Sequence, residues 1–264
     1  MRTGFIGCGN MATAMVRGIL KAKKAMPGEI MVSRRHMEPL RELHKELGIQ
    51  ITTDNKEVTA FSDILFLAVK PQFYAETIEE IRPFIKKDQI VVTIAPGKTL
   101  DWLTEKFQKT VKLIRTMPNT PAMVGEGMMG MCAGENVAAE EFAMVQKMCE
   151  SFGKAERVTE QLMDVVTSVS GSAPAYVFMF IEAMADAAVA DGMPRASAYK
   201  FAAQAVLGSA KMVLDTGKHP GELKDMVCSP GGTTIEAVRV LEEKGLRSAV
   251  IEAMKACTRK SRDM

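Results

Sequence analysis

The sequence has few residues of the kinds that bind metals or act as nucleophiles. Its five cysteines and three histidines are scattered over 264 residues, with no spacing typical of a metal site or of a Cys–His pair. An odd number of cysteines in a chain without a secretion signal indicates reduced thiols. We therefore expect no bound metal and no disulfide bonds.

Net charge and long apolar runs are also scarce. The 34 Lys and Arg residues nearly balance the 32 Asp and Glu residues, and this balance argues against a dedicated nucleic-acid binder. No apolar run is expected to reach the length of a membrane span, and an apolar strand pattern from Thr3 leaves no room for a signal peptide. These absences predict a cytoplasmic protein with no nucleic-acid or membrane partner.

The N-terminal stretch has the pattern of a strand, a glycine turn and a helix. An apolar run over residues 3–6 breaks at GCGNMA, residues 7–12, and a helical spacing follows. In such a unit Gly7 allows the tight turn, and Gly9 lets a pyrophosphate approach the helix N-terminus. Ala12 replaces the third glycine, which this fingerprint tolerates. The pattern predicts a dinucleotide-binding α/β domain of the Rossmann type.

The second predicted strand, residues 29–32, ends without an acidic residue. NAD-binding domains normally place an acid there for the ribose 2′-hydroxyl, whereas this chain has Ser33, Arg34 and Arg35. Guanidinium groups pair bidentately with phosphate oxygens, so these residues favour a 2′-phosphate. NADP(H) is the preferred cofactor on this basis, and NAD(H) remains possible. A solvated basic turn is the alternative interpretation.

Three more apolar runs, residues 64–69, 90–94 and 111–114, predict strands buried on both faces. Turns follow them at residues 68–71 (AVKP), 95–97 (APG) and 115–121 (RTMPNTP). Ligands of open α/β sheets bind beyond the carboxyl ends of the strands. We therefore expect these turns to face one crevice.

Strand patterns stop near residue 161, and helices are expected from there to the end. The predicted helices cover residues 173–190, 195–214, 221–227, 233–241 and 246–257. The chain should thus form an α/β domain over residues 1–161 and an all-α domain over residues 162–264. The two longest helices are alanine-rich and apolar around most of their circumference, so we expect a second subunit to cover them.

The segment SPGGTT, residues 229–234, predicts a loop that leads into a helix. Pro230 fixes its own φ, the two glycines after it permit unusual conformations, and Thr233 or Thr234 is expected to cap the helix through its side chain. The N–H groups and the positive end of the helix dipole favour a small anion such as a carboxylate. A capped helix start without a ligand is the alternative.

Together these motifs resemble the pyrroline-5-carboxylate reductase family. The resemblance rests on residues 7–12 (GCGNMA), 68–71 (AVKP), 117–121 (MPNTP), 170–176 (SGSAPAY), 219–225 (HPGELKD) and 229–234 (SPGGTT). The last two blocks are the most specific, and the match spans essentially the whole chain. Ala173, where the family often has glycine, and Cys228 are small departures that put nothing essential in doubt.

The resemblance implies reduction of the cyclic imine 1-pyrroline-5-carboxylate to L-proline by NAD(P)H, in a homodimer or a larger homo-oligomer such as a decamer. A protonated imine accepts a hydride readily, so the protein needs mainly to position the reactants and exclude water. The residues expected to bind the substrate are Ser229, Gly231, Gly232, Thr233 and Thr234, and the Thr234 hydroxyl is expected to act in catalysis at the ring nitrogen. The residues expected to contact the cofactor are Gly7, Gly9, Asn10, Met11, Ser33, Arg34, Arg35, Ala68, Val69, Lys70, Pro71, Ala95 and Asn119.

Two other functions fit the same architecture. A hydroxyacid dehydrogenase of this kind uses a lysine as acid and base, but residues 171–190 contain no lysine, and their only charged groups are Glu182 and Asp186. A catalytically silent nucleotide-sensing protein would be favoured by loss of the anion loop, and that loop is intact. Both remain alternatives to the reductase.

Overall fold

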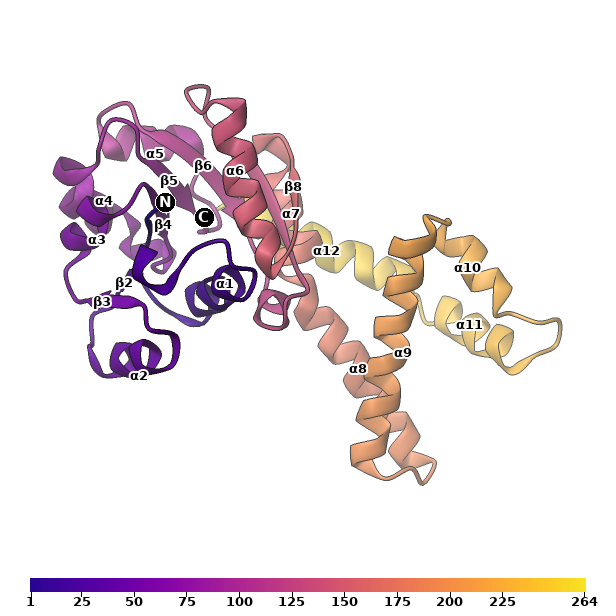
Figure 1. Cartoon of the computed structure of the whole chain (residues 1–264). Coiled ribbons are helices and arrows are strands. Elements are labelled where there is room, and N and C mark those ends of the chain that lie inside the picture. Colours follow the sequence, from indigo (N-terminus) through magenta and orange to yellow (C-terminus); the bar gives the residue numbers. More distant parts are fainter. The chain divides into compact units, whose positions relative to one another are not determined.

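The computed structural model describes residues 1–264, which form two compact units (Figure 1). The first comprises Met1–Ser172 with Cys257–Met264, and the second comprises Ala173–Ala256. This division falls later than the expected change after Gln161. The reason is that the helical turns after Glu160 pack on the sheet, where a β-carbon on Gly130 would lie 2.7 Å from the Val166 side chain.

The first unit is built on an eight-stranded sheet in the order β3-β2-β1-β4-β5-β6-β7-β8. All neighbouring strands are parallel except β6 and β7, which are antiparallel. The strands are β1 (Thr3–Ile6), β2 (Ile30–Ser33), β3 (Gln50–Thr52), β4 (Ile64–Leu67), β5 (Ile90–Thr93), β6 (Lys112–Met117), β7 (Gly127–Ala133) and β8 (Gly153–Arg157). The chain moves outward from β1 to β3 and then returns to β4 beside β1, which creates the switch point where doubly wound sheets bind ligands.

Helices cover both faces of this sheet. They are α1 (Asn10–Lys21), α2 (Glu38–Leu47), α3 (Asn55–Phe61), α4 (Tyr74–Ile81), α5 (Leu100–Phe107), α6 (Ala139–Cys149) and α7 (Met163–Val166). Phe5 and Phe66 face α1, α2 and α6, whereas their neighbours Ile6 and Leu65 face α3, α4 and α5. This alternation explains why the central strands are apolar throughout, since successive side chains enter opposite buried layers.

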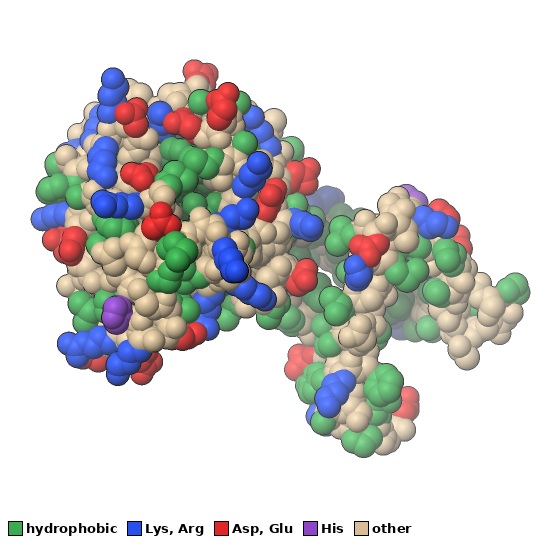
Figure 2. All heavy atoms as spheres, viewed as in Figure 1, with side chains coloured by type: hydrophobic (Ala, Val, Ile, Leu, Met, Phe, Trp, Pro, Cys, Tyr) green, Lys and Arg blue, Asp and Glu red, His purple; other side chains and the backbone are tan.

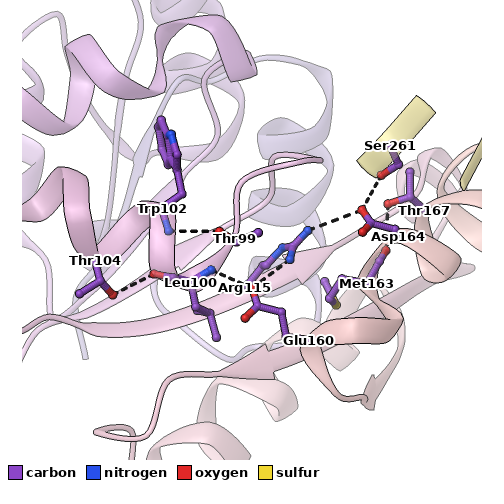
Figure 3. Close-up of polar contacts among 10 residues, drawn as sticks. All are labelled: Thr99, Leu100, Trp102, Thr104, Arg115, Glu160, Met163, Asp164, Thr167 and Ser261. Carbon is purple, nitrogen blue, oxygen red and sulfur yellow. Dashed lines mark hydrogen bonds and ion pairs between the residues drawn. The ribbon is translucent and has the colours of Figure 1, made fainter. Parts of the chain in front are cut away.

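A buried arginine on β6 is linked to the last residues of the chain through the Asp164 carboxylate (Figure 3). The Arg115 side chain pairs with Glu160 at 3.0 Å and with Asp164 at 4.0 Å. Glu160 also accepts a hydrogen bond from the Leu100 amide, and Asp164 accepts one from the Ser261 hydroxyl. The sequence pattern predicted that this strand ends at residue 114. In the structure β6 continues to Met117, so Arg115 lies within the strand and is buried.

The second unit consists of helices alone. They are α8 (Ala173–Ala190), α9 (Arg195–Thr216), α10 (Pro220–Met226), α11 (Thr233–Glu243) and α12 (Leu246–Arg262), whose residues from Cys257 onward belong to the first unit. α8 and α9 pack against each other, with Gly192 at positive φ in their connection. Few of their side chains are buried, and Figure 2 shows hydrophobic side chains at the surface of this unit. One chain therefore leaves the apolar faces of these helices uncovered.

One expectation about apolar length was wrong. A continuous helical stretch, Glu160–Ala190, is long and apolar enough to cross a membrane, and an 18-residue window within it has a mean hydropathy of 1.4. The Ser, Thr and Gly residues at 167–172 interrupt the apolar pattern, yet the structure continues through them as a π-helical turn, Thr167–Gly171. Length and composition alone are weak evidence for a span, and Glu182 and Asp186 lie within this stretch.

Candidate active site

The glycine turn after β1 lies against the end of β4. Gly7 has φ +90°, and a β-carbon there would lie 2.7 Å from the Val69 backbone nitrogen. The Gly7 and Cys8 amides donate to the Ser33 carbonyl oxygen at 3.1 and 3.0 Å, which fixes the turn to the end of β2. A side chain at position 7 is therefore excluded by both conformation and space.

Gly9 has a different role in the same turn. It is the N-cap of α1, no side chain caps the helix, and a β-carbon on Gly9 would meet no atom within 4 Å. The first N–H groups of α1 are thus left for another acceptor, and open space lies beside them. This is the arrangement that admits a pyrophosphate at a helix N-terminus.

A cleft of about 480 Å³ opens beside this turn. Its lining residues are Gly7, Cys8, Gly9, Arg34, Arg35, His36, Thr53, Asn55, Ala68, Val69, Lys70, Phe73, Glu76, Thr77 and Glu80. Seven expected cofactor contacts are among them, from the ends of β1, β2 and β4. The switch point of the sheet thus brings together residues that lie up to 63 positions apart, from Gly7 to Lys70.

The basic end of β2 lies in this cleft. Arg34 and Arg35 are exposed, and the Arg35 guanidinium lies 4.2 Å from the centre of the Phe73 ring. Stacking on an aromatic ring holds a guanidinium plane while its N–H groups stay free for phosphate. No acidic side chain occupies the end of β2, as the sequence indicated.

Six expected cofactor contacts do not line the cleft: Asn10, Met11, Ser33, Pro71, Ala95 and Asn119. Two of them have side chains fully engaged elsewhere. The buried Ser33 hydroxyl donates to Asn55, and Asn119 bridges the Ser170 carbonyl and the Met128 amide. Ala95 belongs to the core below the sheet. Direct contact between these six residues and a cofactor stays a prediction.

Other lining residues were missed from the sequence. Thr53 and Asn55 follow β3, a three-residue strand with no apolar run to reveal it. Glu76, Thr77 and Glu80 lie on α4, which begins just after Pro71. Their spacing of one, three and four residues places them on one face of a helix, which is a signal that the sequence does carry.

The Cys8 thiol lines the cleft, but its surroundings do not activate it as a nucleophile. Burial raises its pKa, and this effect outweighs the Thr13 hydrogen bond and the nearby Arg34 charge, which lower it. Desolvation likewise raises the pKa of Cys132 to about 11. The thiols of Cys8 and Cys132 are therefore neutral near pH 7, and no cluster of His, Cys, Asp or Glu is placed to hold a metal.

The predicted anion loop has the expected course with one difference. Gly231 has φ +67°, the Gly232 amide donates to the Ser229 carbonyl oxygen at 3.0 Å, and α11 begins at Thr233. We expected Thr233 or Thr234 to cap this helix, but the N-cap is Gly232 and no side chain caps it. That expectation was wrong, because the turn places both threonines inside the first turn of the helix.

The uncapped start matters for ligand binding. The Thr233 and Thr234 side chains are exposed, and the first N–H groups of α11 have no side-chain acceptor. A β-carbon on Gly232 would lie 2.4 Å from the Ser229 hydroxyl oxygen, so a side chain at position 232 would displace this hydroxyl. The loop therefore presents amides, two threonine hydroxyls and a serine to solvent, a donor set that suits a carboxylate.

The first unit has three features that suit a dinucleotide. They are a glycine turn with no space for a side chain at Gly7, a helix start without a side-chain cap, and a basic strand end. Together with a helical second unit, this defines the class of two-unit dinucleotide-dependent oxidoreductases. Residues 2–97 match the family described as NADP oxidoreductase coenzyme F420-dependent. Residues 160–264 match the family described as pyrroline-5-carboxylate reductase dimerisation. This chain belongs to the pyrroline-5-carboxylate reductase family.

Relatives with this name are similar over nearly the whole chain. Pyrroline-5-carboxylate reductase of Escherichia coli (strain K12) is 54% identical over 260 residues, which cover 98% of this chain and 97% of that protein. The Methanosarcina acetivorans protein is 42% identical, with 100% and 97% covered. The crystal structure of Plasmodium falciparum pyrroline carboxylate reductase with NADP bound is 30% identical, with a TM-score of 0.91 and 100% and 97% covered.

Proposed function

We propose that this chain reduces 1-pyrroline-5-carboxylate to L-proline with NADPH, the last step of proline biosynthesis. Membership of the family and the NADP-type cleft support this function. The observation that carries it is the start of α11, where a glycine N-cap leaves the first amides and the Thr234 hydroxyl free for a substrate. The catalytically silent alternative offers no reason for this donor set to be kept.

NADPH supplies the hydride in this reaction. The turn from Gly7 to Gly9 and the first amides of α1 would hold the pyrophosphate, and Arg34 and Arg35 would hold the 2′-phosphate. Ala68, Val69 and Lys70 would line the nicotinamide side of the cleft. Asn10, Met11, Pro71, Ala95 and Asn119 would contribute backbone contacts or support, as would Ser33 beneath the basic pair.

The second unit would hold the imine. The amides of Gly231 and Thr233, with the Ser229 hydroxyl, bind the ring carboxylate, and Gly232 allows the tight turn that places them there. The Thr234 hydroxyl forms a hydrogen bond with the ring nitrogen and orients the C=N bond for attack at the imine carbon, which becomes C5 of proline. The nitrogen keeps its proton as C5 receives the hydride, so the product is a secondary amine and no strong acid is required. Lys70 contributes a positive charge on the cofactor side.

Residues 162–264 act as the dimerisation and substrate-binding domain, and residues 1–161 act as the cofactor domain. The exposed apolar side chains of α8 and α9 support a dimer in which a second copy covers them. Dimers of this kind would be the unit of a larger ring such as a decamer. We place the enzyme in the cytoplasm.

A spectrophotometric assay tests this function. Purified protein mixed with NADPH and the imine should consume NADPH at a rate proportional to enzyme concentration and should form L-proline. NADPH that binds without being oxidised in the presence of the imine would instead identify a nucleotide-sensing protein.

A further inference from the structure

Three polar side chains at the cofactor cleft, Ser33, Asn55 and Glu80, form a chain of hydrogen bonds, which we call the relay. The Ser33 hydroxyl lies 2.7 Å from Asn55 Oδ1, and Asn55 Nδ2 lies 2.8 Å from Glu80 Oε2. Ser33 ends β2, Asn55 begins α3 and Glu80 lies on α4, so the relay joins three elements. Asn55 and Glu80 both line the cleft, and Ser33 is fully buried.

Glu80 sets the direction of this relay. An ionised carboxylate only accepts hydrogen bonds, so the Asn55 side-chain NH₂ group must face Glu80. The amide oxygen then faces Ser33, and the Ser33 hydroxyl must donate to it. Without the carboxylate the Asn55 amide is free to turn over, because a serine hydroxyl donates or accepts equally well.

The relay leaves one N–H of the Asn55 amide for a further acceptor. Arg34 and Arg35, the residues beside the expected 2′-phosphate, line the same cleft. A fixed donor at this place is suited to an oxygen of the ribose that carries the 2′-phosphate. A donor whose orientation is set before binding loses less entropy when the ligand arrives.

We propose that Glu80 is a positioning residue for the dinucleotide, which holds the Asn55 amide with its donor available to the ribose. The proposal rests on the proposed function only in taking NADPH as the ligand. Glu80 does not touch the reacting atoms. Its removal should therefore weaken cofactor binding and leave the turnover rate at saturating NADPH unchanged.

The effect of the Glu80 hydrogen bond is separable from that of a charge in the cleft. Glu80→Gln keeps a hydrogen-bonding group beside Asn55, but its amide can donate as well as accept and therefore fixes the Asn55 amide only in part, whereas Glu80→Ala removes the interaction. Glu76 lies one helical turn earlier on α4 and lines the same cleft, but the Asn55 amide donates to Glu80. Glu76→Ala is therefore the matched control: it removes a carboxylate from the cleft and keeps the hydrogen bond between Asn55 and Glu80.

The test is titration of each variant with NADPH in the absence of the imine, read as the dissociation constant. Glu80→Ala should raise the NADPH Kd by about three- to tenfold, the range for one lost hydrogen bond. Glu80→Gln should raise the Kd by less than Glu80→Ala, because its amide can accept from Asn55 in only one of its two orientations, and Glu76→Ala should not raise the Kd. Asn55→Ala should raise the NADPH Kd as much as Glu80→Ala does. The double variant should have a Kd no higher than that of either single variant, because both changes remove the same interaction.

An unchanged Kd for Glu80→Ala, or losses that add in the double variant, would overturn the proposal. An equal loss of NADPH affinity in Glu76→Ala would also overturn the proposal. It would show that the negative charge in the cleft, and not the hydrogen bond to Asn55, affects NADPH binding. These binding measurements are independent of imine reduction. Wild-type protein that binds NADPH but leaves the imine unreduced would contradict the proposed function alone.

Discussion

Gly7 and Val69 approach so closely that a β-carbon on Gly7 would lie 2.7 Å from the Val69 backbone nitrogen. Gly7 also has φ +90°, a conformation that other residues adopt at a cost of about 1–3 kcal/mol. Gly7→Ala should therefore lower the free energy of unfolding by at least this amount and should weaken NADPH binding. Denaturant unfolding of the variant beside the wild type measures the first effect.

Gly9→Ala should separate binding from stability in the same turn. Gly9 has φ −89°, and a β-carbon there meets no atom within 4 Å, so the variant should unfold at the wild-type denaturant midpoint. The added methyl group would occupy the space expected for the pyrophosphate, and the NADPH Kd should rise on the order of tenfold. A Gly9→Ala protein with wild-type NADPH affinity would place the cofactor elsewhere.

Arg34 and Arg35 should determine the choice between NADPH and NADH. Replacing both with alanine should weaken NADPH binding by about 1–3 kcal/mol and change NADH binding little, because only NADPH carries the 2′-phosphate. Kd values for both cofactors measure this, with Arg41→Ala on exposed α2 as the control. Equal losses of affinity for NADPH and NADH would show that the two arginines stabilise the conformation of the turn and do not bind the 2′-phosphate.

Thr234→Ala should impair turnover without destabilising the protein. Its side chain caps no helix, so the melting temperature should be nearly that of the wild type. If its hydroxyl positions the ring nitrogen, kcat should fall by on the order of tenfold to a thousandfold, with normal NADPH binding. Thr234→Ser keeps the hydroxyl and should recover much of the rate. A near-normal kcat for Thr234→Ala would remove this residue from the mechanism.

The exposed apolar residues of the second unit should be covered by a second copy. Phe201 on α9 and Met26 in the first unit are similarly exposed in one chain, at 69% and 67%. Phe201→Glu should therefore shift the protein from dimer toward monomer in sedimentation and lower its activity, since a charge in an apolar interface is costly. Met26→Glu should leave both unchanged. A folded, active wild-type monomer at assay concentration would contradict this account.

Continuous apolar runs made much of the fold predictable from the sequence. β1 and α8 begin and end at the expected residues, because two-sided burial and helical periodicity leave clear patterns. β3 was missed because it has three residues at the edge of the sheet, with polar residues after it. Arg115 was expected in a turn because its buried position depends on Glu160 and Asp164, more than 40 residues away.

The site was predicted in outline, and its side-chain details were not. The glycine turn and the ends of β2 and β4 meet in one cleft, as their sequence positions at strand ends indicated. The direction of the Ser33 side chain could not be predicted, because it depends on Asn55, which follows the missed strand. The cap of α11 was assigned to a threonine because caps usually have side-chain oxygens, whereas the helix begins at Thr233, as expected, with Gly232 as its N-cap.

The central claim is hydride transfer from NADPH to the imine carbon. The most direct test uses NADPH that carries deuterium at the transferable position of C4, incubated with the protein and 1-pyrroline-5-carboxylate. Mass spectrometry of the product should find L-proline with one deuterium, at C5, and one NADPH oxidised for each proline formed. NADPH oxidation without proline, or proline without deuterium, would contradict the proposed function.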